Sequence, residues 1–262
     1  MHKRTLILCA SLLVVSLVAA CGGGGSNDEI PPAPAGGGGS GGGPAFDMSK
    51  VNATVTGKIS FEGTPPPNDK AQMSSDPYCQ MHAADYPTVE TTKVSDGGLE
   101  NVIVYISGNA PTGSFPLPEP MEINQENCHY IPHVFTLRTG QQLKVKNSDA
   151  TLHNIHALPK GNKEFNTGQP IQGMKTTHTF EGKEVMVPFK CDVHGWMNAY
   201  VGVLDHPYFA TTGDDGKFEL KTLPPGTYTI EAWHEKLGAT TQSVTLGPKE
   251  SKEIMFTFKA PA

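Results

Sequence analysis

Short alternating segments separated by glycine and proline constrain this chain's fold more than any other feature. Residues 51–61 alternate apolar and polar side chains, and Phe135 to Val145 alternates again around Gly140. The run 102–106 is apolar on both faces, as a central sandwich strand is. No long segment has an apolar period of 3.6 residues, and the chain contains 29 glycines and 22 prolines. The pattern predicts an all-β protein.

One loop between two strand-like segments carries side chains of metal-binding type. Cys191, His194 and Met197 have C-x-x-H-x-x-M spacing, and apolar runs lead into Cys191 and out of Met197. A thiolate, an imidazole and a thioether, completed by one distant histidine, are what a His2Cys copper site with a weak axial methionine requires. The candidate for the distant histidine is His153, which Asn154 follows. The loop would bring all four ligands to one end of a sandwich.

These residues resemble the copper-binding residues of the cupredoxins. The segment Asn147 to Asn154, followed by C-x-x-H-x-x-M, is similar to the amicyanin and plastocyanin branch, with a ligand loop of the shorter amicyanin type. The resemblance implies a Greek-key β-sandwich that binds one type 1 copper ion. The implied ligands are His153, Cys191, His194 and Met197.

The resemblance also implies roles for the neighbours of the ligands. Asn154 would tie the His153 loop to the cysteine loop by hydrogen bonds. His194 would be the more exposed imidazole, through which electrons enter or leave, and Trp196 would form part of the docking face. His156 lies three residues after His153 and is the alternative ligand. The His-Asn pair favours His153 and leaves His156 as an outer partner or a surface residue.

The N-terminus has the layout of an export signal. Lys3 and Arg4 precede an apolar run over residues 6–17, which is shorter than the roughly 20 residues of a membrane-spanning helix. The run ends in Val-Ala-Ala before Cys21, which resembles a bacterial lipobox and implies cleavage before Cys21 with diacylglycerol on its sulfur. The alternative is an ordinary signal peptide cut at Ala20. We expect a signal over residues 1–20 and a disordered Gly/Pro-rich tether over 21–48. The lipid on Cys21 would anchor the exported protein to the periplasmic side of the inner or outer membrane, or to the cell surface.

Counting cysteines supports the metal-ligand interpretation. Of five cysteines, Cys9 leaves with the signal and Cys21 carries lipid, so three remain. An odd thiol in an oxidising compartment demands a reason, and Cys191 as a ligand supplies one. Cys79 and Cys128 are then expected to form a disulfide. The alternatives are that Cys191 is an inert buried thiol or a disulfide partner, or that a second metal site exists, whose candidate residues are Cys79, His82, Cys128, His129 and His133.

The C-terminal region resembles a second β-sandwich. Residues 215–220 followed by 223–228 resemble the carboxypeptidase regulatory-like module, a small transthyretin-like sandwich. Strands of the kind that open this module occur about one hundred residues upstream. We therefore expect a discontinuous sandwich over residues 49–111 plus 206–262, with the cupredoxin inserted as residues 112–205. The alternative is that the N-terminal piece adds strands to the cupredoxin.

The resemblance implies a lipid-anchored blue copper protein that carries single electrons between redox partner proteins and is not an enzyme. A copper chaperone or storage protein could use the same ligands. Copper oxidases and nitrite reductases need a further catalytic copper bound by additional histidines, and the sequence lacks the H-x-H pair that would bind it. The remaining alternative is a structural pair of β-sandwiches with a vestigial site. Loss of residues 1–20 reduces the 20 basic residues to 18 against 26 acidic ones, a net charge of about −8. The sequence has no basic patch with interleaved aromatic residues, which argues against nucleic acid as a partner.

Overall fold

The computed structural model describes residues 53–83, 88–89 and 91–260. The expected signal, the tether and Cys21 lie outside these residues. The prediction of an all-β protein is confirmed, because regular structure in the described part is almost entirely strand, apart from a 3₁₀ turn (Met73–Ser75) and the short helix α1 (Pro77–His82). Among the residues described, no helix is both long and apolar enough to cross a bilayer.

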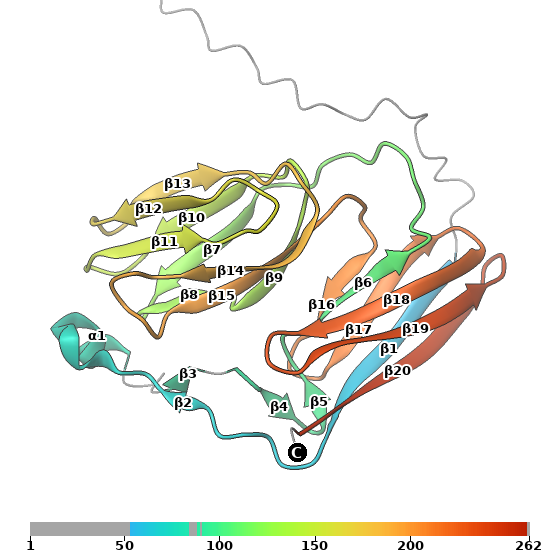
Figure 1. The fold of residues 1–262 in the computed structure, drawn as a ribbon, viewed down its shortest axis with the longest axis horizontal. Coiled ribbons are helices and arrows are strands. Elements are labelled where there is room, and N and C mark those ends of the chain that lie inside the picture. The colour runs from blue at the N-terminus through green and yellow to red at the C-terminus, as the bar shows by residue number, and fades with distance from the viewer. Residues whose placement is uncertain (1–52, 84–87, 90, 261–262) are drawn as a thin grey trace, which may run out of the picture. The chain divides into compact units, whose positions relative to one another are not determined.

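Residues 121–204 form one sandwich of two mixed sheets, which we call the inner sandwich (Figure 1). One sheet has the order β13-β10-β7-β8, and the other has the order β12-β11-β14-β15-β9. The strands are β7 (Met121–Glu126), β8 (His129–Ile131), β9 (Val134–Arg138), β10 (Leu143–Asn147), β11 (His153–Ala157), β12 (Phe165–Gln169), β13 (Lys175–His178), β14 (Glu184–Lys190) and β15 (Asn198–Leu204).

Alternation along these strands produces the core of the inner sandwich. Leu143 and Val145 of β10 are buried, whereas Lys144 between them is exposed, because successive side chains point to opposite faces of a sheet. Strands β7 and β10 pair in parallel, as do β9 and β15. Apolar side chains of both sheets, such as Ile123 and Val201, meet in one core cluster. Cys191 belongs to the same cluster, so the core extends to the ligand loop.

The segments on either side of the inner sandwich pair with each other in two further sheets, which we call the flanking sandwich. Their orders are β17-β1-β5-β4, with β20 also on β1, and β16-β6-β18-β19. The strands are β1 (Ala53–Glu62), β4 (Val94–Ser95), β5 (Gly98–Leu99), β6 (Ile103–Gly108), β16 (Phe209–Thr211), β17 (Lys217–Leu223), β18 (Gly226–His234), β19 (Gly238–Leu246) and β20 (Ser251–Lys259).

Strand β1 shows how the two ends of the chain come together. It pairs in parallel with β20, from Thr54 opposite Ser251 to Glu62 opposite Lys259. Gly57 permits this close approach, because a Cβ atom there would lie 2.1 Å from the Ile254 carbonyl oxygen. The N-terminal strands β1 and β6 therefore pair with strands of the C-terminal region rather than with the inner sandwich. The division into two separate domains stays a prediction.

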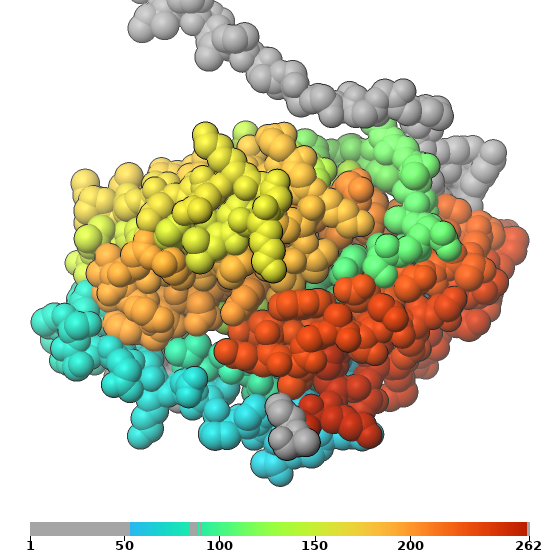
Figure 2. Space-filling model, viewed as in Figure 1, coloured from blue at the N-terminus to red at the C-terminus, as the bar shows by residue number. Residues whose placement is uncertain are grey.

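The connection from β1 to β6 reaches the ligand end of the inner sandwich. It contains a small ladder of β2 (Asp69–Lys70) and β3 (Thr88–Val89) as well as α1. We call residues 76–82 the cap. Asp76 is the N-cap of α1, and its Oδ1 atom accepts hydrogen bonds from the backbone N–H groups of Tyr78 (2.7 Å) and Cys79 (3.2 Å). In Figure 2 this cyan segment lies against the orange atoms of the inner sandwich.

Candidate metal centre

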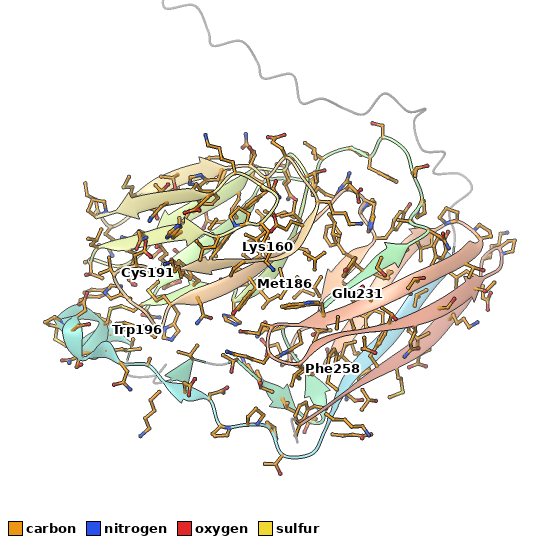
Figure 3. All side chains as sticks on the ribbon, viewed as in Figure 1. Lys160, Met186, Cys191, Trp196, Glu231 and Phe258 are labelled. Carbon is orange, nitrogen blue, oxygen red and sulfur yellow. A yellow bond between two sulfur atoms is a disulfide. The ribbon has the colours of Figure 1, made fainter. Side chains whose placement is uncertain are left out.

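The ligand loop is a closed turn between β14 and β15. The backbone N–H of Cys191 donates to the Met197 carbonyl oxygen (3.1 Å), and that of Met197 donates to the His194 carbonyl oxygen (2.9 Å). The His194 N–H points at the Cys191 Sγ atom, 3.4 Å away. The loop's own backbone therefore holds the cysteine and the histidine on one side. Figure 3 shows Cys191 and Trp196 at the end of the inner sandwich next to α1.

His153, Cys191 and His194 converge in a buried pocket. The Nδ1 atoms of the two histidines are 2.9 Å apart, and Cys191 Sγ lies 3.9 Å from His194 Nδ1. One nitrogen from each ring and the sulfur all lie within 4.8 Å of one another. The exposed fractions are 0% for His153, 2% for Cys191 and 1% for His194. Two imidazoles and one thiolate are the donor set of a trigonal copper site.

The far nitrogen of each imidazole is held by a carboxylate. His153 Nε2 lies 2.8 Å from Asp149 Oδ2, and His194 Nε2 lies 3.0 Å from Asp76 Oδ2. Burial alone would raise the pKa of Asp149, but hydrogen bonds from the His153 ring and two backbone N–H groups lower it. An ionised carboxylate only accepts hydrogen bonds, so each Nε2 carries the hydrogen. The lone pair of each neutral ring is then on Nδ1, the atom that faces the pocket.

Cys191 is also in the form that binds a metal ion, the thiolate. Burial on its own would raise the pKa of Cys191, but hydrogen bonds from His153, from His194 and from the backbone lower it to about 6. A thiolate and two Nδ1 lone pairs meeting at these distances require a positive charge between them, from either a proton or a metal ion. Although burial lowers the pKa of His153, its hydrogen bond to Asp149 leaves that pKa raised overall. The pocket is therefore built to hold a cation, and its donors fit copper.

Asn154 and Met197 complete the environment of the three ligands. Asn154 Oδ1 accepts from the Asp192 backbone N–H (2.8 Å) and lies 3.3 Å from Cys191 Sγ, so it links the His153 strand to the ligand loop. Met197 is fully buried in the same core cluster as Cys191. A thioether and a thiolate are soft donors, and such donors favour copper over metals that prefer oxygen ligands.

Solved structures similar to this chain align with only part of it and at low identity. No protein-family model and no curated protein matches the sequence. A Cu-containing nitrite reductase from Thermus scotoductus SA-01 aligns with 37% of this chain and 25% of its own length, at 18% identity and a TM-score of 0.32. A purple cupredoxin from Nitrosopumilus maritimus aligns with 32% of this chain and 98% of its own length, at 22% identity and a TM-score of 0.28. An oxidised amicyanin variant aligns with 38% of this chain and 97% of its own length, at 19% identity and a TM-score of 0.29. The chain thus spans a quarter of the nitrite reductase. The described part of the chain is built of β-sandwiches.

His156 lies apart from His153, Cys191 and His194. It is three positions after His153 on β11, so its side chain points to the opposite face of the strand. Its Nδ1 lies 3.0 Å from Asp192 Oδ2 and its Nε2 lies 2.6 Å from Glu164 Oε1. The structure therefore groups His153, and not His156, with Cys191.

The cysteines and histidines of the alternative second metal site are also placed. Cys79 and Cys128 form a disulfide with a Cα–Cα distance of 5.7 Å, whereas Cys191 is a free thiol. His133 pairs with the carboxylate of Glu235 in the flanking sandwich. None of the His, Cys, Asp and Glu groups that could hold a metal among the described residues includes His82, His129 or His133.

Two residues that the cupredoxin resemblance assigns to electron entry and docking, His194 and Trp196, are both buried in this structure. His194 is 1% exposed against 0% for His153, because the cap covers it and Asp76 lies at its Nε2 atom. Trp196 is not on an open docking face either. It is 8% exposed, and its indole N–H donates to the Cys128 carbonyl oxygen (3.0 Å). Cys128, one half of the disulfide that anchors the cap, thus also holds the Trp196 side chain of the ligand loop.

The two carboxylates, Asp149 and Asp76, are not among the site residues predicted from the sequence. Asp149 lies four residues before His153 within the Asn-Ser-Asp turn, and this spacing was a usable signal for an acid that reaches the ring. Asp76 stands immediately before Pro77, which signals only a helix start. Nothing in the sequence places it beside His194, because 118 residues separate them.

Proposed function

We propose that this protein is a blue copper protein that carries single electrons between redox partner proteins and is not itself an enzyme. One observation carries the proposal: two Nδ1 lone pairs and the Cys191 thiolate converge in a buried pocket while both Nε2 atoms are already bonded to carboxylates. His153, Cys191 and His194 would hold one copper ion, with Met197 as the weak axial ligand. Bound copper supplies a one-electron couple whose site needs little rearrangement.

The first test is the colour of the protein with copper. Full-length protein titrated with Cu(II) is expected to develop the intense visible absorption of a thiolate-bound type 1 site, saturating at one copper per chain. Reduction should bleach it and reoxidation should restore it, because the ligands are preplaced. The measurements are an absorption spectrum and a metal analysis. A protein that stays colourless with a free Cys191 thiol would contradict the proposal.

Burial of the ligands favours a resident metal over a transferred one. A copper chaperone hands its ion to a partner through ligand exchange, which requires access to the ligands, whereas the cap and the core enclose His194 and Cys191. Rapid transfer of Cu(I) from this protein to an added chelator would favour the handling function instead. We expect slow transfer, measured by the absorbance of the chelator complex.

We further propose that the protein is exported and lipid-anchored through Cys21. The proposal rests on the apolar run followed by Val-Ala-Ala-Cys and on the Gly/Pro-rich segment after it. In a bacterial host, Cys21→Ala is expected to move most of the protein from the membrane fraction to the soluble fraction. Cys9→Ala changes a cysteine within the signal and should leave the distribution unaltered. Equal fractionation of both variants would refute the anchor.

A further inference from the structure

Asp76 performs two tasks with its two carboxylate oxygens. Oδ1 caps α1, whereas Oδ2 accepts hydrogen bonds from Thr151 Oγ1 (2.8 Å) and lies 3.0 Å from His194 Nε2. The residue comes from the cap rather than from the inner sandwich. A copper ligand of one segment is therefore oriented by a charge that another part of the chain supplies.

Asp149 makes the matching arrangement at the other imidazole. Its Oδ2 lies 2.8 Å from His153 Nε2 and accepts from the Cys128 backbone N–H (2.8 Å). Asp76 likewise accepts from the Cys79 backbone N–H. The disulfide between Cys79 and Cys128 thus joins the two backbone segments that hold the two carboxylates. Tyr78 adds a further link, with its hydroxyl 3.4 Å from Asp149 Oδ1.

We propose that Asp76 and Asp149 are positioning residues that tune the metal centre, an inference that rests on the proposed copper function. Each fixes its imidazole with Nδ1 toward the pocket and places a negative charge at the far nitrogen. Outer-shell carboxylates raise the basicity of a ligating histidine. In a site with both rings buried, this charge stabilises Cu(II), the more positive state, relative to Cu(I). The pair therefore lowers the reduction potential of the one-electron couple.

The test replaces the charge and keeps the helix cap. Asp76→Asn and Asp76→Ser each retain an oxygen that can cap α1. We expect each to lower the affinity for Cu(II) relative to Cu(I) by about tenfold, within the 10–100-fold range of outer-shell partners. A tenfold change in a one-electron couple corresponds to an upward shift of about 59 mV. Potentials are measured by redox titration of the blue absorption, and apo-protein melting curves establish that the variants fold.

Thr151→Val is the matched control, because it removes a hydrogen bond to the same Oδ2 atom and leaves the charge. We expect no upward shift from it. An equal upward shift in Thr151→Val and Asp76→Asn would reduce the role of Asp76 to packing and overturn the proposal, as would an unchanged potential in both Asp76 variants.

A second readout separates this inference from the proposed function. The affinity for Zn(II), which has no redox chemistry, should also fall in Asp76→Asn and not in Thr151→Val, because the oriented imidazole binds either metal. If the wild-type protein takes up copper without blue colour, the electron-carrier function fails, whereas the Zn(II) comparison still tests Asp76. Equal Zn(II) affinities would overturn the positioning role alone.

Discussion

The Cys191→Ser variant is expected to lose the blue colour completely while it keeps its fold. The thiolate is the ligand that gives a type 1 site its intense absorption, and a serine hydroxyl does not ionise near neutral pH. The native thiolate is available because hydrogen bonds to the two histidines lower the pKa of Cys191 to about 6, against the effect of burial. Copper affinity should fall by more than the roughly 10–100-fold that loss of an outer partner costs.

The control for this variant lies in the same loop. Val193 is 47% exposed and next to His194, so Val193→Ala alters the loop without touching a ligand and should keep the colour. Absorption spectra of copper-loaded samples and melting curves of the metal-free proteins give the comparison. Colour retained by Cys191→Ser, or lost by Val193→Ala with its fold intact, would mean that the sulfur is not the source of the absorption.

The meeting of His153, Cys191 and His194 in one pocket could be predicted from sequence because most of its information is local. Cys191, His194 and Met197 lie within seven residues of a loop between two strands, and such a loop closes through its own backbone. His153 was separable from His156 only by the Asn that follows it, since both are histidines near one loop. The strand period settles the question in the structure, because residues three apart on β11 face opposite sides.

The covering of the ligands could not be predicted, because it depends on a distant segment. Whether His194 is exposed is decided by Asp76 and Cys79, more than one hundred residues away. The cysteine count suggested that Cys79 and Cys128 pair, but it carried no information about what the pairing would cover. The burial of Trp196 could not be predicted for the same reason. An aromatic residue in a loop is equally suited to an open docking face and to a buried hydrogen bond such as the one with Cys128.

Removal of the disulfide is expected to destabilise the protein and to open its metal centre. The bridge joins residues 49 positions apart. For a loop of this length the chain-entropy model gives about 4 kcal/mol, and measured values are typically about 2–4 kcal/mol. We expect Cys79→Ala/Cys128→Ala to lower the free energy of unfolding of the metal-free protein by an amount in that range. Denaturant titration of the double variant and of wild type measures the difference.

The consequence for the metal follows from what the bridge holds in place. The Cys79 and Cys128 backbone N–H groups donate to the two carboxylates that orient His194 and His153. Without the covalent link the cap is held only by hydrogen bonds and by packing such as that of Tyr78 on the core, and its transient opening would expose the His194 side chain. Copper-loaded double variant should therefore lose its metal to a chelator at least several times faster than wild type.

The lower stability of the double variant also speeds metal loss, so a control with lower stability and an intact cap is needed. Gly57→Ala, which strains the flanking sandwich at the Ile254 carbonyl, is that control. It should lower stability without speeding copper loss. Equal acceleration in both variants would show that global unfolding, rather than the cap, limits access to the copper.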